Sequence, residues 1–214
     1  LLVEFEYKIW SAGEGSTMGL ADGLSVFLYD GATEQIDFNP GHHGGALIYA
    51  NGPSADDEGL SNGYLGIGLD EYGNFSVTSG GKIGGMPALV PNSIALRGGA
   101  NGGYSYISGT GPNLSKSLSA KDVDAKLANV SIGYIPKSSA RPVDDQFYRK
   151  VRFYLLPTTD GTDFQISVEL QKDTGGPFYT VIKNQRMGVR PPSLLKVGFG
   201  ASTGDGWANH EVRH

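Results

Sequence analysis

The chain has 214 residues, with 33 glycines, 11 prolines, no cysteine and a formal net charge of −5. The absence of cysteine excludes a disulfide framework and any metal site built on thiolates. An acidic balance without a basic run argues against nucleic acid as a partner. No apolar stretch is long enough to predict membrane insertion. We therefore expect a glycine-rich globular domain.

The dominant pattern is an alternation of apolar and polar residues, which is typical of half-buried β-strands. It begins within residues 1–10, where every second position from Val3 to Ile9 is apolar. It returns at 24–28, 65–69, 94–96, 130–134, 151–155, 164–170, around Val181, and at 195–199 and 209–214. Only 115–129 has a helix-like composition, and its apolar residues are too sparse for a long amphipathic helix.

Many short strands without intervening helices predict an antiparallel β-sandwich or barrel, organised as a single domain over 1–214. Because strand patterns reach both ends of the chain, we expect it to be a fragment of a longer polypeptide. The segments between strands are long, and long loops on a rigid β scaffold are where binding residues concentrate. These predicted loops are 31–45, 50–63, 73–92, 98–125 and 136–146.

Catalytic patterns are weak in this sequence. It contains no nucleophile elbow, phosphate-binding loop or zinc-protease motif. His42 and His43 are adjacent, so on an extended chain they point to opposite faces, and a polar surface loop is the favoured interpretation. His210 and His214 lie four residues apart in the predicted strand 209–214, and a role without metal binding is favoured still more strongly for them. A sandwich-fold glycosidase needs two carboxylates on one face, whereas Asp70 and Glu71 are neighbours.

The segment 65–75, Leu-Gly-Ile-Gly-Leu-Asp-Glu-Tyr-Gly-Asn-Phe, leaves three interpretations open. Asp70, the Tyr72 carbonyl and Asn74 offer hard oxygen donors of the kind that Ca²⁺ prefers. An amide beside an aromatic ring also suits a sugar, which needs hydrogen bonds and a flat apolar face. The third interpretation is an ordinary polar turn after a strand.

Three further loop–strand junctions carry distinctive motifs: Ala-Asp-Gly at 21–23, His-Gly-Gly at 43–45 and Ala-Ser-Thr-Gly at 201–204. With the segment 65–75, and in this order along the whole chain, they resemble the L-type (legume) lectin family. The likeness is strongest to the lectin-like domains of large bacterial surface adhesins. The resemblance implies an all-β fold, the antiparallel, concanavalin A-like (legume lectin) jelly roll.

The resemblance also implies roles for individual residues in binding a sugar. Asp22, after a cis peptide with Ala21, would accept hydrogen bonds from sugar hydroxyls, and Asn74 would donate its amide. The other implied ligand contacts are a backbone N–H of Gly44 or Gly45, the stacking ring of Tyr72, and the loop residues Asp205, Gly206 and Trp207.

The metal site of the family is only partly matched. Gly68 and Ser79 stand where acidic residues are expected, so no transition-metal site is predicted. A calcium site would keep Asp70, the Tyr72 carbonyl and Asn74, but it lacks an evident fourth protein ligand among the 6–8 oxygens that Ca²⁺ takes. Calcium therefore stays open as a cofactor.

The resulting expectation is a non-catalytic carbohydrate-binding domain of adhesin type, secreted or displayed on a cell surface. Its expected partners are glycans or glycoconjugates and other domains of the same polypeptide. The first alternative is a structural or protein-binding sandwich module of a surface protein. A sandwich-fold glycosidase is less favoured.

Overall fold

The computed structural model describes residues 1–10, 20–110, 148–172 and 174–213. The predicted strand at 130–134 and the helix-like segment 115–129 lie outside these residues. The strands are β1 (Leu2–Trp10), β2 (Gly23–Asp30), β3 (Gly63–Asp70), β4 (Ser93–Arg97), β5 (Tyr106–Gly109), β6 (Arg149–Pro157), β7 (Phe164–Gln171), β8 (Phe178–Arg186), β9 (Leu195–Ser202) and β10 (Asn209–Arg213). Three short 3₁₀ turns are described as well: η1 (Gln35–Asp37), η2 (Gly44–Ala46) and η3 (Ala100–Gly102).

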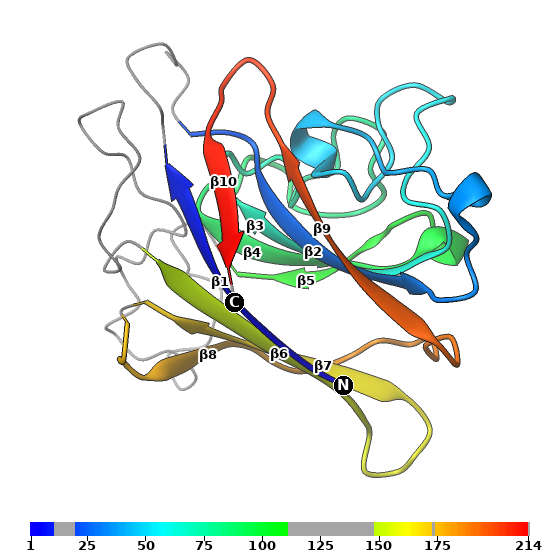
Figure 1. Cartoon of the computed structure of the whole chain (residues 1–214). Helices are drawn as coiled ribbons and strands as arrows, with labels where there is room; N and C mark the ends of the chain where they lie inside the picture. Colours follow the sequence, from blue (N-terminus) through cyan, green and yellow to red (C-terminus); the bar gives the residue numbers. More distant parts are fainter. Residues whose placement is uncertain (11–19, 111–147, 173, 214) are drawn as a thin grey trace.

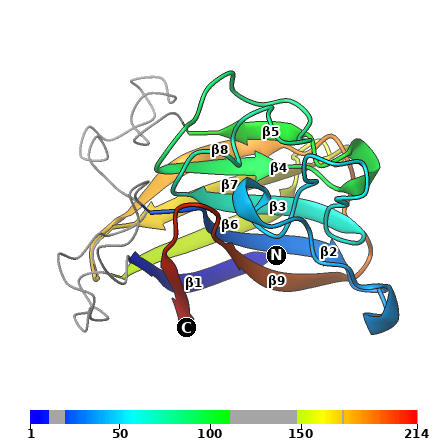
Figure 2. The ribbon, with the colours of Figure 1, turned by 90° about the horizontal axis from the view of Figure 1, so that it is seen from above.

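The strands form two five-stranded antiparallel sheets, in the orders β10-β1-β6-β7-β8 and β5-β4-β3-β2-β9. Figure 1 and Figure 2 show the two sheets stacked as the layers of a sandwich. The predicted antiparallel β-sandwich is thus confirmed. Among the described residues, no helix is long and apolar enough to cross a membrane.

The core between the sheets follows the period-two alternation, because successive side chains of a strand point to opposite faces. In β3, Leu65, Ile67 and Leu69 are buried against the second sheet. Facing strands contribute Tyr7 and Phe153, among others, to the same cluster.

A second apolar cluster covers the outer face of the β2–β3–β4 sheet, beneath the long loops, and includes Phe27, Tyr49 and Phe75. Two outward positions in the middle of β3 are glycines, Gly66 and Gly68. A Cβ at Gly66 would lie 2.3 Å from Cδ1 of Tyr49, and a Cβ at Gly68 would lie 2.3 Å from Cδ1 of Phe75. The Gly-x-Gly pattern therefore lets the loops pack directly on the outer face of this sheet. The loops form a third layer, in addition to the two sheets.

One predicted loop contains more regular structure than expected. Within the segment 98–125, η3 and β5 form, and β5 extends the sheet beyond β4. The alternation there is weak, because β5 is a four-residue edge strand whose residues are all half-buried.

Candidate functional site

Four strand ends lie in one row across the β5-β4-β3-β2-β9 sheet. Gly23 is paired with both Asp70 and Ser202, and Asp70 is paired with Ser93. The chain leaves or enters the sheet at each of these positions. The motifs at 21–23, 65–75 and 201–204 are therefore brought to the same rim.

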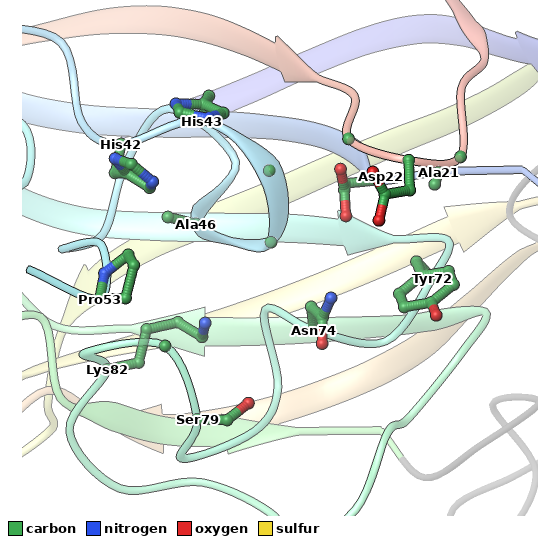
Figure 3. Close-up of a pocket in the computed structure, with 16 residues that line it drawn as sticks. Ala21, Asp22, His42, His43, Ala46, Pro53, Tyr72, Asn74, Ser79 and Lys82 are labelled. Carbon is green, nitrogen blue, oxygen red and sulfur yellow. The ribbon is translucent and has the colours of Figure 1, made fainter.

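A hollow of about 380 Å³ opens at this rim. Most of the predicted ligand-contacting residues line it, namely Asp22, Gly44, Gly45, Tyr72, Asn74, Asp205 and Gly206. Trp207 is half-buried in the same loop but is not among the lining residues. Figure 3 shows Asp22 and Asn74 on facing sides of the hollow, with Tyr72 beside them.

Asp22 is held in place by its backbone. The Ala21–Asp22 peptide is cis. The Asp22 N–H donates to the carbonyl of Ser202 (2.8 Å), and its carbonyl accepts from the N–H groups of Glu71 (3.1 Å) and Tyr72 (3.2 Å). These bonds tie the start of β2 to the end of β9 and to the loop after β3.

The carboxyl group of Asp22 is buried yet incompletely satisfied. The residue is only 5 % exposed, and its Oδ2 accepts no hydrogen bond from the described residues. Burial raises its pKa, as does the charge of Asp205, while His43, Lys82 and the Asn74 side chain lower it. A buried acceptor without a donor is costly, so this oxygen is poised to accept a bond from a ligand.

Glycines form the walls around the Asp22–Asn74 pair. A Cβ at Gly45 would lie 2.2 Å from Cβ of Asn74, and one at Gly204 would lie 3.1 Å from Oδ2 of Asp22. Gly44 also has a positive φ of 60°, which L side chains rarely adopt. Larger residues at these positions would fill the hollow or displace the two polar side chains.

Asp70, a predicted calcium ligand, lies beneath the hollow and does not line it. It is fully buried, and both of its carboxylate oxygens accept hydrogen bonds. Oδ1 accepts from the Gly73 N–H (2.9 Å), and Oδ2 accepts from the N–H and the hydroxyl of Ser76 (3.0 Å each). Burial raises the pKa of Asp70 to about 6, although these hydrogen bonds lower it.

The oxygen atoms around Asp70 are a poor set of ligands for the predicted calcium ion. Asp70 already uses both oxygens to shape the loop of residues 73–76, and the described part of the chain contains no group of three His, Asp or Glu side chains that could hold a metal ion. Calcium with Asp70, Tyr72 and Asn74 as ligands stays a prediction, but the residues present do not fit the ion well.

Lys82 also lines the hollow, although nothing in the sequence indicated that it belongs to the site. The residue is only 9 % exposed. Burial and the charge of Arg97 together lower its pKa to about 8, although Asp70 and Asp22 act to raise it. A single lysine in a glycine-rich loop carries no periodic signal, so only its position in space reveals it.

His42 and His43 also line the hollow, with ring centroids 4.1 Å apart. The interpretation of this pair as a polar surface loop gave no reason to place it beside Asp22. Glu71, the carboxyl group that would support the glycosidase alternative, is buried and does not line the hollow.

Comparison with solved structures gives plant lectins. The Lotus tetragonolobus seed lectin matches with a TM-score of 0.51 and 14% identity, covering 99% of this chain and 68% of that one. The metal-free form of lectin I-B4 from Griffonia simplicifolia matches at 0.49 and 16%, covering 100% and 71%. The basic winged bean lectin with Tn-antigen matches at 0.45 and 15%, covering 99% and 67%.

No protein-family model matches the chain, and no curated protein sequence does. At these identities the likeness concerns the fold. The chain therefore has the concanavalin A-like sandwich of the legume lectins, as predicted.

Proposed function

We propose that this chain is a non-catalytic carbohydrate-binding domain that recognises glycans in the hollow between Asp22 and Asn74. The observation that carries the proposal is the buried Asp22 carboxylate oxygen, which lines the hollow and lacks a hydrogen-bond donor among the described residues. A sugar hydroxyl is a donor of the right kind, and a bond to a charged acceptor is stronger than a neutral one.

The neighbouring groups complement a sugar. The Asn74 amide can donate to a ring or hydroxyl oxygen, and the Tyr72 ring offers an apolar face. The glycine walls leave the hollow open to a rigid ring. Its volume of about 380 Å³ is at the small end of ligand sites and suits one or two sugar units.

A shallow site of this kind binds weakly on its own, with a Kd near 1 mM, about −4 kcal/mol. Such affinity is useful when many copies are displayed together, because effective concentration raises avidity. We therefore place the domain in a secreted or surface-displayed polypeptide of adhesin type. The lectin names of the structural neighbours support the carbohydrate-binding part of this proposal.

The test is glycan-array binding by the purified chain and two variants, Asp22→Asn and Asn74→Ala. We expect each substitution to reduce binding about tenfold or more, because each removes one partner of a desolvated hydrogen bond. Asp37→Asn, at an exposed carboxylate outside the hollow, is the matched control and should bind as the wild type does. Thermal melts establish that each variant is folded.

The outcomes separate the function from the site. Binding by the wild type that survives both substitutions would place the sugar elsewhere on the domain. A wild type that binds no glycan would favour the structural or protein-binding alternative.

A further inference from the structure

The loop that carries Lys82 is fixed by a buried arginine. Arg97, at the end of β4, is fully buried, and its guanidinium donates to five backbone carbonyls. These belong to Phe75 (2.8 Å), Val77 (2.8 Å), Ile83 (3.0 Å), Gly84 (3.3 Å) and Tyr104 (3.0 Å). Four of these carbonyls flank Lys82 on its two sides in the chain, so the path of its loop is set by Arg97.

Lys82 projects from this loop into the hollow. Figure 3 shows its side chain extending toward Asn74, on the side of the hollow that faces Asp22. Its charge interacts favourably with Asp22 and Asp70, the carboxyl groups at the wall and beneath the floor. Gly80 leaves room for it, since a Cβ there would lie 3.1 Å from Nζ of Lys82.

The buried charges around the hollow balance without a metal. Asp22 and Asp70 supply two carboxylates, while Lys82 and Arg97 supply two cations. Glu71, which is buried beside Asp70, adds little negative charge at neutral pH, because burial and Asp70 raise its pKa to about 8. Arg97 also interacts favourably with Asp70. A divalent ion added to this set would be repelled by two positive charges in a partly desolvated site.

We propose that the Lys82 ammonium, which lines the hollow together with Asp22 and Asn74, is the resident cation of this site and takes the charge-balancing role that a divalent metal would otherwise have. The site is then organised without calcium. This inference concerns the same hollow as the proposed function, but its test uses no sugar, so either can fail while the other stands.

The test uses calcium alone as the probe, in buffers matched for ionic strength. Calorimetric titration of CaCl₂ into the wild-type chain should give no saturable heat, and its Tm should be the same in millimolar calcium and in chelator. Saturable calcium binding with a rise in Tm would overturn the proposal, since a ligand bound only by the native state stabilises it.

Lys82→Met removes the charge and keeps the length of the side chain. We expect its Tm in chelator to fall by about 5 °C or more, because two buried carboxylates lose a counter-charge. Millimolar calcium should recover part of that fall. Lys183→Met, at an exposed lysine on β8, is the matched control and should melt as the wild type does in both buffers.

A Lys82→Met variant that melts as the wild type does, or that does not respond to calcium, would contradict the proposal. Lys82→Arg keeps a positive charge and should remain indifferent to calcium. If Lys82→Met does not fold, the calcium titrations of the wild type and of Lys82→Arg still decide the question.

Discussion

Gly45 lies directly against Asn74, so that a Cβ at position 45 would stand 2.2 Å from the Asn74 Cβ. The pair joins two loops that are distant in the chain, one after β2 and one after β3. The orientation of the amide proposed to bind the sugar therefore depends on the absence of a side chain in the facing loop.

Gly45→Ala should reduce glycan binding about tenfold, because the added methyl group must displace Asn74 or its loop, and overpacking of this kind costs about 1–3 kcal/mol. Array binding and the Tm of the variant are the measurements. Gly98→Ala is the matched control, since a Cβ there would meet its nearest atoms at an ordinary 3.7 Å. Equal binding by the two variants would argue against a role for the Gly45–Asn74 contact.

Arg97→Met should lower the free energy of unfolding by about 3–5 kcal/mol, because five backbone carbonyls, three of them in buried hydrogen bonds, lose a charged donor. Denaturant unfolding measures this loss, and hydrogen exchange should accelerate over residues 76–86. Arg97→Lys should recover little of it, because one ammonium cannot reach carbonyls spread around a planar guanidinium. A lysine variant as stable as the wild type would show that only the charge matters.

Gly66→Ala should destabilise the fold by about 1–3 kcal/mol, because its Cβ would lie 2.3 Å from the ring of the fully buried Tyr49. The Tyr49 hydroxyl also donates to the Gly98 carbonyl (2.9 Å), so the ring has little freedom to move. The midpoint of urea unfolding is the measurement. If Gly66→Ala is as stable as the wild type, the Tyr49 ring and its loop can move to make room for the added methyl group, contrary to this prediction.

His210 should make stability depend on pH. Burial lowers its pKa from 6.5 to about 4, so in this window the unfolded chain binds a proton that the folded chain does not. The contribution of neutral His210 to the free energy of unfolding is therefore present above pH 6.5 and is lost as the pH falls toward 4. The resulting decrease in the free energy of unfolding is at most about 3 kcal/mol.

His210→Gln removes this titration. The difference in unfolding free energy between the wild type and the variant should shift against the wild type as the pH falls through that window. A difference that stays constant with pH would mean that His210 titrates in the folded chain as it does in the unfolded one.

The sequence by itself determined the strands and the direction in which their side chains point. Alternation is a local property, so Leu65, Ile67 and Leu69 predict a core face without any knowledge of their partners. The acid of Ala-Asp-Gly and the amide at Asn74 were likewise identified as candidates from their motifs, and the structure brings both to one hollow. The short β5 was missed because four half-buried residues carry too little alternation to predict a strand.

Only the tertiary structure decided what surrounds those two residues. Pairing of Gly23 with both Asp70 and Ser202 aligns the loops, and the carbonyls that bind Arg97 direct Lys82 into the hollow. The same arrangement commits the oxygens of Asp70 to Gly73 and Ser76 and leaves Trp207 outside the lining. These outcomes depend on contacts between segments far apart in the chain, and a local pattern of residue types carries no information about such contacts.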